Sequence, residues 1–459
     1  MAGIGFELRR MMRKETLGGM AHTYLYAGLI GSGPWVISII AILIIGLFAA
    51  ANTAQSLAVE QFQVSISYLM AGSLLLTSPL QMLFTRFAAD RIYEKRSDAI
   101  LPNLIGALGV TVLVSAIVGG TVLRLWFDGP FLYQLCMLAG FVILCCIWIL
   151  QIFASAIDAP YTVVLAFASG YAITVGAALS LRTFGLDGLM SGFIAGQAFL
   201  LFTLLAMIVR QFPAQRLIAF SFLRSKLIFP ELALIGLFYN LGVWADKMIF
   251  WSDALTGVPV IGPLRASPIY DLPIFLAYLS IIPGMAMFFI RMEVGVADQC
   301  AQFYRSVTGG GSYAAITHEK EKLVAAIRHC LLEIIKVQAV TTLLLLMFGS
   351  ELLRLFGMSP LYLPLLSVDL VAVAMQLVLL AILSFFFYLD RRRIALALCV
   401  LFFVTNTIFS FISLHAGPLF YGYGFAIAVL LTAIAGALWL SSTLDRLEYE
   451  TFMLQPVKF

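Results

Sequence analysis

The chain has 459 residues, of which 62% are hydrophobic and only 11% are charged, and its mean hydropathy is +1.01. A soluble domain carries about 25% charged residues, so these values exclude a soluble protein and indicate one that crosses a membrane many times. The net charge of +4 at pH 7 is small, and no basic cluster interleaves with aromatic residues, as a surface for nucleic acid requires.

Windows of about twenty apolar residues predict twelve membrane-spanning helices. The N-terminal segment has the charges of a signal peptide, but its apolar run is too long to be one, so we interpret it as the first retained span. The predicted spans are 21–50, 61–85, 102–124, 132–155, 161–181, 187–209, 228–251, 270–290, 330–349, 361–389, 393–414 and 422–441.

The Lys and Arg residues predict the orientation of these spans. Of the 28 in the chain, 22 lie at the termini or in connections on one side, four lie on the other side, and Lys247 and Lys336 lie within spans. Because connections rich in Lys and Arg stay in the cytoplasm, we expect both termini to be cytoplasmic and the number of spans to be even.

The polar stretch 210–227 separates six spans from six. We therefore predict an all-α membrane protein with an N-terminal six-helix bundle (1–209), a cytoplasmic linker (210–227) and a C-terminal six-helix bundle (228–459). Similar patterns recur in the two halves, such as Gly-x-Trp at 33–35 and 242–244, and the prolines Pro79 and Pro283. Six is even, so we expect the bundles to be related by a pseudo-two-fold axis along the membrane normal.

The connection 291–329 is the longest between the predicted spans. It contains the glycine run Thr308–Ser312, which lacks the lysine that completes a phosphate-binding loop. We interpret it as a flexible joint, followed by a charged, solvated helix that leads into the ninth span.

The most informative stretch lies in the seventh span, at residues 239–247. It holds an acid and a base inside an apolar helix, where charge is costly and is functional by default. It aligns with residues 30–38 of the first span, and two interrupted spans at matching positions point to the binding cavity of a transporter. The predicted cavity residues are Asp246, Lys247, Trp244, Asn240, Trp35 and Ser38, and the predicted helix breaks are Gly33, Pro34 and Gly242.

Asp246 and Lys247 are adjacent, so on a helix they point about 100° apart, and we expect that they do not neutralise each other. Asp246 would face the cavity and contact a cation or an amino sugar. Lys247 either joins it there or snorkels toward water at the outer end of the span. Trp35 and Trp244 either stack on sugar rings in the cavity or anchor the helices at the membrane interface.

Two further arginines, Arg86 and Arg291, follow the prolines of the second and eighth spans. They are topogenic charges and candidates for a cytoplasmic gate. We find no Ser/His/Asp setting, no metal-ligand spacing and no nucleotide loop, and the six cysteines suit neither a disulfide framework nor a zinc site. The sequence therefore predicts no enzyme activity, no cofactor and no metal.

Twelve spans in two halves, with interrupted first and seventh spans, resemble the multidrug/oligosaccharidyl-lipid/polysaccharide (MOP) flippase superfamily. Residues 1–10, 31–35 and 238–247 resemble the PelG family of exopolysaccharide transporters within it, and the likeness extends over essentially the whole chain. The resemblance implies a Gram-negative inner membrane and a polymer of partly deacetylated N-acetylgalactosamine. It also implies partners, namely a cytoplasmic glycosyltransferase and other inner-membrane subunits of a synthesis complex.

We therefore expect an inner-membrane transporter that moves an amino-sugar polymer from cytoplasm to periplasm through a cleft between the bundles. A cation-coupled drug exporter of the same fold is one alternative, although spans one to six hold no carboxylate apart from Asp158, at a turn. A scaffold of a polysaccharide synthase that transports nothing is the other, but it would need neither matched helix breaks nor charges within spans.

Overall fold

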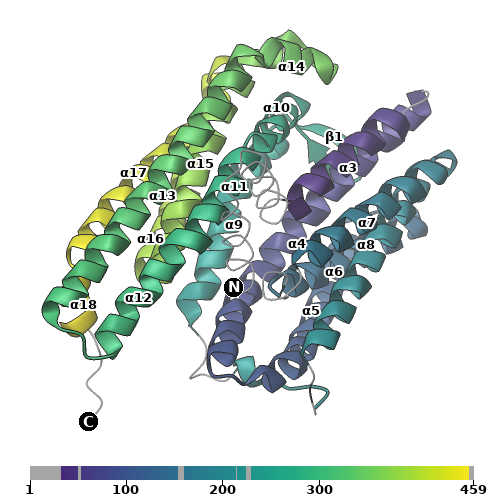
Figure 1. The fold of residues 1–459 in the computed structure, drawn as a ribbon. Coiled ribbons are helices and arrows are strands. Elements are labelled where there is room, and N and C mark those ends of the chain that lie inside the picture. Colours follow the sequence, from purple (N-terminus) through teal and green to yellow (C-terminus); the bar gives the residue numbers. More distant parts are fainter. Residues whose placement is uncertain are drawn as a thin grey trace. The chain divides into compact units, whose positions relative to one another are not determined.

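The computed structural model describes residues 33–49, 53–153, 160–212, 214, 216–223 and 229–453. These residues form an almost entirely helical chain with one short β-hairpin (Figure 1). Ten of their helices are long and apolar enough to cross a membrane, or eleven if one bent pair counts as a single span. The all-α membrane class is therefore confirmed. The predicted number of twelve is not, since much of the first predicted span precedes Gly33 and lies outside the described residues.

Residues Gly33–Pro268 form one compact unit, and the described residues from Ile269 onward form another. The unit boundary lies later in the chain than the predicted linker at 210–227, because the seventh predicted span packs on the second. The division into two six-helix bundles related by symmetry stays a prediction. Below, these units are called the first unit and the second unit, and each is described by itself.

The described residues of the first unit form seven α-helices and the hairpin. They are α3 (Gly33–Ala49), α4 (Thr53–Tyr93), α5 (Ile100–Trp126), α6 (Phe131–Gln151), α7 (Pro160–Ser180), α8 (Gly185–Gln211), α9 (Pro230–Ser252), β1 (Val258–Ile261) and β2 (Leu264–Ala266). Two apolar cores hold them together. One gathers side chains of α4 to α8 around Phe84 and Phe153, and the other lies around Phe62 and Phe193, where Leu264 of the hairpin joins it.

α4 and α9 run antiparallel in the first unit. Near the start of α9, Gly236 lies so close to α4 that a Cβ there would come within 2.5 Å of the Ser78 carbonyl. Farther along α9, Trp251 stacks on Tyr68, an earlier residue of α4, with ring centroids 4.7 Å apart. The contact partners thus move back along α4 as α9 advances.

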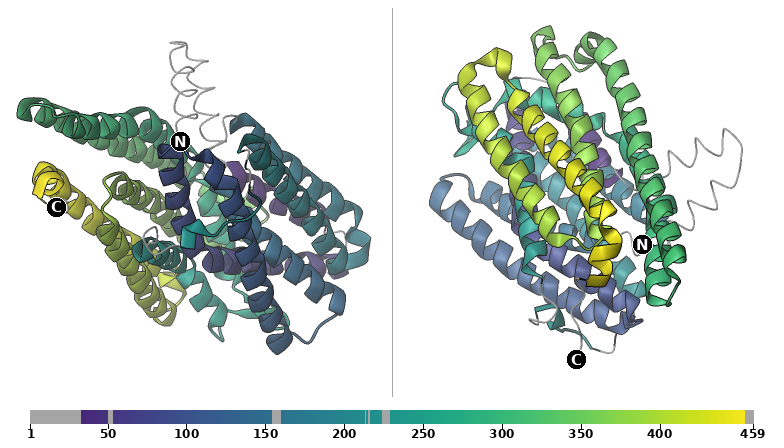
Figure 2. Two further views of the ribbon diagram at one scale, coloured as in Figure 1. Left: turned by 90° about the horizontal axis from the view of Figure 1, so that it is seen from below. Right: turned by 90° about the vertical axis from the view of Figure 1, so that its left-hand side faces the viewer.

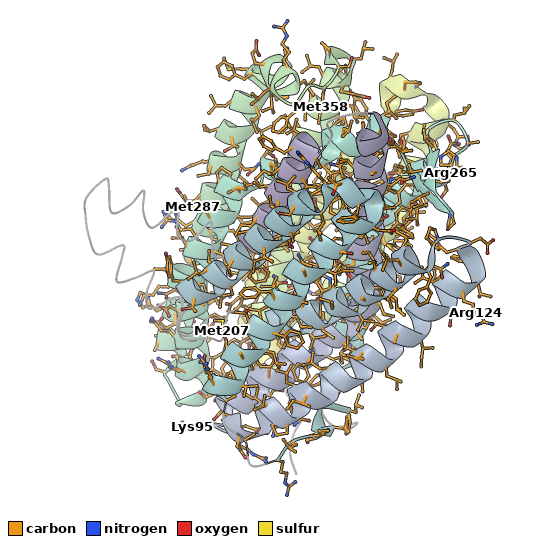
Figure 3. The ribbon with its side chains drawn as sticks, turned by 90° about the vertical axis from the view of Figure 1, so that its right-hand side faces the viewer. Lys95, Arg124, Met207, Arg265, Met287 and Met358 are labelled. Atoms are coloured by element: carbon orange, nitrogen blue, oxygen red, sulfur yellow. The ribbon has the colours of Figure 1, made fainter. Side chains whose placement is uncertain are left out.

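The hairpin covers one end of the first unit and is tied to it by polar contacts. The Tyr68 hydroxyl donates to the carbonyl oxygen of Arg265 at 2.9 Å. The Arg265 guanidinium in turn donates to the carbonyl oxygens of Asp253 at 3.0 Å and Gly257 at 2.6 Å. Figure 3 shows Arg265 and Arg124 away from Lys95: Lys95 lies in the turn before α5, and Arg124 lies in the last turn of that helix.

The second unit contains nine helices. They are α10 (Pro268–Leu279), α11 (Ile282–Arg291), α12 (Ala297–Thr308), α13 (Tyr313–Met347), α14 (Gly349–Leu355), α15 (Leu363–Tyr388), α16 (Arg392–Ala416), α17 (Tyr423–Asp445) and α18 (Leu447–Met453), with a π-helical turn at Met292–Val296. α12 and α13 lie side by side (Figure 2). The glycine run joins them, and the charged stretch after it forms the first part of α13, continuous with the ninth span as expected.

The eighth predicted span is broken. α10 ends at Leu279, α11 begins at Ile282, and the helices meet at a bend of 42°. Pro283 lacks an N–H and cannot bond the Leu279 carbonyl four residues earlier, which is how a proline breaks a helix. The next carbonyl oxygen, of Ser280, accepts a hydrogen bond from the side-chain amide of Gln338 in α13 at 3.1 Å.

Candidate functional site

Asp246 and Lys247 form a buried ion pair in α9. The Lys247 ammonium lies 3.0 Å from Oδ2 and 3.3 Å from Oδ1 of Asp246, and it also donates to the Val243 carbonyl oxygen at 3.0 Å. The exposed fractions of the two side chains are 0% and 2%. An acid and a base are thus held, away from solvent, inside an apolar span.

Our expectation that these neighbours would not neutralise each other was wrong. The 100° between successive Cβ directions applies where the side chains leave the helix, but the flexible four-carbon stem of lysine reaches much farther. Lys247 folds back along the preceding turn, as its bond to Val243 shows, and so meets the carboxylate of Asp246. It does not extend toward water at the helix end, as the snorkelling interpretation required.

Trp244 lies in a small aromatic cluster with Ala71 and Trp251. Its ring centroid is 6.1 Å from that of Trp251, which itself stacks on Tyr68. Only 8% of Trp244 is exposed. The cluster joins α9 to α4 on both sides of the ion pair in the sequence, with Trp244 before it and Trp251 after it, so these aromatic rings fix where α9 presents its charges.

Asn240 and Gly242 lie within the same continuous helix. The Asn240 amide donates to the Gly236 carbonyl at 3.0 Å, one turn earlier. The predicted break at Gly242 is wrong, because α9 runs unbroken from Pro230 to Ser252. Glycine weakens a helix only modestly and keeps its N–H, so neighbouring packing is enough to hold it helical. The break within the described part of the chain is instead at Ser280.

Residues 30–38 of the first predicted span, which align with residues 239–247, lie only in part among the described residues. Gly33 and Pro34 are the first residues of α3, where a proline is well suited to the first turn. The residues that would continue the span before them lie outside the described residues, as does the side chain of Trp35. Ser38 is buried and hydrogen-bonds the Tyr171 hydroxyl of α7, so this residue links α3 to α7.

The gate candidates each have an acidic partner within their own unit. Arg86 of α4 pairs with Asp90, with 3.1 Å between Nε and Oδ1, and lies over the Phe229 ring at 5.8 Å from its centroid. Arg291, at the end of α11, pairs with Glu333 of α13 at 3.7 Å. Both arginines are partly exposed, so neither ion pair is fully shielded from solvent.

One polar contact was missed by the analysis of the sequence. Gln338, which spans the break of the eighth span, was detectable only as one amide in an apolar helix. Asp369, by contrast, is recognisable in the sequence as a polar residue within a span, expected either to line the cavity or to bond between helices, and it is fully buried in α15. A Cβ on Gly422 would lie 3.0 Å from its Oδ1, and Gly422 caps the N-terminus of α17 with φ of 84°. A helix N-terminus favours a carboxylate.

No group of three or more potential metal ligands occurs among the residues that the structure describes. The six cysteines are buried and unlinked.

This fold is that of the MOP transporters. An outward-facing multidrug resistance MATE family transporter of that superfamily aligns with 93% of this chain and 96% of its own, with TM-score 0.67 and 16% identity. A MOP superfamily transporter from Pyrococcus furiosus, whose structure was reported with a reversed polarity of the binding pocket, gives TM-score 0.63 and 14% identity over the same shares. At these identities the likeness concerns the fold alone.

The family follows from the sequence profile. The profile of PelG, described as "Putative exopolysaccharide Exporter (EPS-E)", matches residues 1–452, and the chain belongs to this family. No match was found among curated proteins. The protein is thus a multi-pass membrane protein of a polysaccharide transporter family with a MOP-type fold.

Proposed function

We propose that this protein moves an amino-sugar-containing exopolysaccharide from the cytoplasm to the periplasm across a bacterial inner membrane, through a cleft between its two predicted bundles. Membership of the exopolysaccharide exporter family over residues 1–452 supports the class of substrate. The distribution of Lys and Arg supports the orientation, with both termini in the cytoplasm.

The observation that carries the proposal is the buried pair of Asp246 and Lys247. A buried ion pair stabilises a protein little, because the cost of removing two charges from water offsets most of their attraction. Within a membrane span, such charges usually mark a path for substrate or ions. A pair that contributes little to folding, in a transporter family, is best explained by a role in transport.

In this proposal, Asp246 exchanges one cation for another. At rest its carboxylate holds the Lys247 ammonium. During export it would hold an ammonium group of the deacetylated sugar, and Lys247 would turn toward hydroxyl or acetyl oxygens of the polymer. The pair is closed from solvent in the present structure, so the exchange requires a conformation in which α9 opens toward the polymer.

The other predicted residues have supporting roles in the proposal. Trp35 and Trp244 would stack on sugar rings, with Asn240 and Ser38 as further polar contacts in the cavity. Gly33 and Pro34 would act as a hinge of the first span, and Arg86 and Arg291 as the cytoplasmic gate. The partners would be a cytoplasmic glycosyltransferase, which supplies the growing polymer, and other inner-membrane subunits.

The experiment replaces Asp246→Asn and Trp244→Ala separately in cells that carry the complete synthesis system, and measures exported amino-sugar polymer per unit of membrane-inserted protein. We expect export to fall for both variants at normal abundance. The matched control is Lys336→Met, which removes a lysine from a span where 67% of that side chain is exposed. Parental export by both Asp246→Asn and Trp244→Ala would disprove the cavity assignment.

A cation-coupled exporter of small molecules is the second candidate, because multidrug transporters share this fold. For this function, collapsing the proton or sodium gradient should abolish transport within minutes, and expression should raise resistance to cationic drugs. Export that continues without either gradient, together with unchanged resistance, would remove the candidate.

A further inference from the structure

An apolar groove of about 450 Å³ opens in the first unit, between α4 and α5. Its floor is α6, which contributes Met137, Leu138 and Phe141. Its volume is in the range of about 300 to 1,000 Å³ that is typical of ligand sites. Unlike such sites, it has no charged residue and only one polar group in its lining, the hydroxyl of Tyr68.

The groove exists because α4 and α5 separate along their length. Near the start of α5, Leu104 and Ala107 pack into the same core as Phe84 and Phe87 of α4. Farther on, the two helices separate, and the side chains of α5 that face the gap are partly exposed, at 39% for Val118 and 37% for Val122. Among the described residues of the first unit, no side chain fills this space.

Glycines keep the groove wide. Gly72 of α4 and Gly119 of α5 both line it. A Cβ on Gly72 would come within 3.3 Å of Phe141, and one on Gly119 within 3.0 Å of Leu138 and Phe141. Phe127, which follows α5, and Leu264 of β2 complete the lining of this groove, called the slot below.

The Tyr68 hydroxyl does not make the slot polar. It is already engaged with the Arg265 backbone, donating to the carbonyl oxygen at 2.9 Å and accepting from the N–H at 3.3 Å. A sugar or a charged drug would lose its hydrogen bonds to water on entering and gain none, at a cost of several kcal/mol per polar group. The contents of the groove must therefore be hydrocarbon.

We propose that this groove binds one acyl chain of a membrane phospholipid. The helices that form it are long and apolar enough to cross a membrane, so the groove belongs to a membrane-spanning part of the first unit. At roughly 30 Å³ per methylene, about the share of a water molecule, the groove holds about fifteen methylene groups, the length of a single acyl chain. The acyl chain replaces the side-chain packing that the separated helices lack.

The experiment fills the groove and measures lipid. Val118→Phe/Val122→Phe places two rings on the face of α5 that borders the slot. Leu113→Phe/Ile117→Phe is the matched control, on the same helix with the same spacing, at residues that are 62% and 59% exposed and do not line the slot. Each protein is reconstituted in vesicles of phosphatidylethanolamine that carries a photoreactive diazirine near the middle of one acyl chain, and adducts are mapped by peptide mass spectrometry.

We expect adducts of the parental protein and of the control to concentrate on the α4, α5 and α6 segments that form the slot. In the filled variant these adducts should fall at least about fivefold, because a packed interior leaves no room for a chain. Adducts on the exposed face of α13 serve as the internal reference and should not change. Equal slot labelling in the filled variant and the control, or labelling no denser in the slot than on α13, would overturn the proposal.

The test separates this inference from the proposed function. Labelling reports on the lipid and needs no polymer, so the lipid site can fail while export by the parental protein is intact. Conversely, loss of export in Asp246→Asn would support the proposed polymer path. Normal slot labelling in that same variant would show that the lipid site does not depend on the ion pair.

Discussion

The Gln338 side-chain amide donates to the Ser280 carbonyl oxygen at 3.1 Å, across the break between α10 and α11. The same amide carries its oxygen against the first turn of α11, since a Cβ on Gly284 would lie 2.4 Å from Oε1. One residue of α13 therefore lies against both halves of the broken span. Gln338 is 1% exposed, so water does not replace it in this conformation.

Gln338→Leu should loosen the break. The substitution introduces an apolar side chain of similar size and removes the donor to Ser280, and a buried acceptor without its partner costs about 1–3 kcal/mol. We expect faster amide hydrogen exchange across residues 279–285, with little change in α15. Gln376→Leu, which alters a buried amide of α15 instead, is the control. Identical exchange at the break in the parental protein and Gln338→Leu would show that the bond is not needed there.

The ion pair predicts an unequal response to single and double substitution. Lys247→Met leaves a buried carboxylate without its cation and should destabilise the protein by about 3–5 kcal/mol, whereas replacing both charges by apolar residues is often neutral. We expect Asp246→Leu/Lys247→Met to recover most of the thermal stability in detergent but not polymer export. Recovery of export by the double variant would refute a role of these charges in transport.

The contact of α9 with α4 depends on a glycine. Gly236→Leu must displace α9, because even a Cβ would lie 2.5 Å from the Ser78 carbonyl oxygen, and overpacking costs about 1–3 kcal/mol. A lower melting temperature should be visible by fluorescence-detected size exclusion. Gly176→Leu in α7 is the control, since nothing lies within 4 Å of its Cβ position. Equal melting temperatures for the two variants would contradict the close approach of these helices.

The loop after α9 should respond to acid through Asp253. Backbone N–H groups of Thr256 and Leu255 donate to its carboxylate at 3.0 and 2.9 Å, and these bonds hold the pKa of Asp253 below its ordinary value of 3.8. A lowered pKa in the folded state stabilises the loop above the unfolded value, and this stabilisation is lost as pH falls through the folded value.

The stabilising effect of Asp253 is measured as the difference in protection of the loop 253–257 between the parental protein and Asp253→Ala. Proteolysis of the loop 253–257 by a protease active from pH 3 to 7 is a suitable assay. We expect the variant to be cleaved faster at pH 6 to 7, and the two proteins to converge below pH 3.8. A difference that persists undiminished at pH 3 would mean that the charge of Asp253 is not responsible.

Two prolines at matching places show why sequence patterns alone do not predict helix breaks. Pro79 leaves the Leu75 carbonyl without its helical donor, but the Ser78 hydroxyl donates to that oxygen at 3.2 Å, and α4 continues past Pro79 to Tyr93. Pro283 has no such neighbour, and its span bends by 42°. The Ser78 hydroxyl, one residue before Pro79, thus explains why α4 continues while the span that contains Pro283 bends.

The sequence by itself determined the class of this protein, because a chain with 62% hydrophobic residues can satisfy its backbone in a membrane only as helices or a closed barrel. It also located Asp246 and Lys247, since charge within an apolar span is visible in one dimension. Only the tertiary structure decided that these charges pair, that Gly242 stays helical, and that α9 packs on α4. Those outcomes depend on side-chain reach and on contacts between segments far apart in the chain, which composition and spacing do not encode.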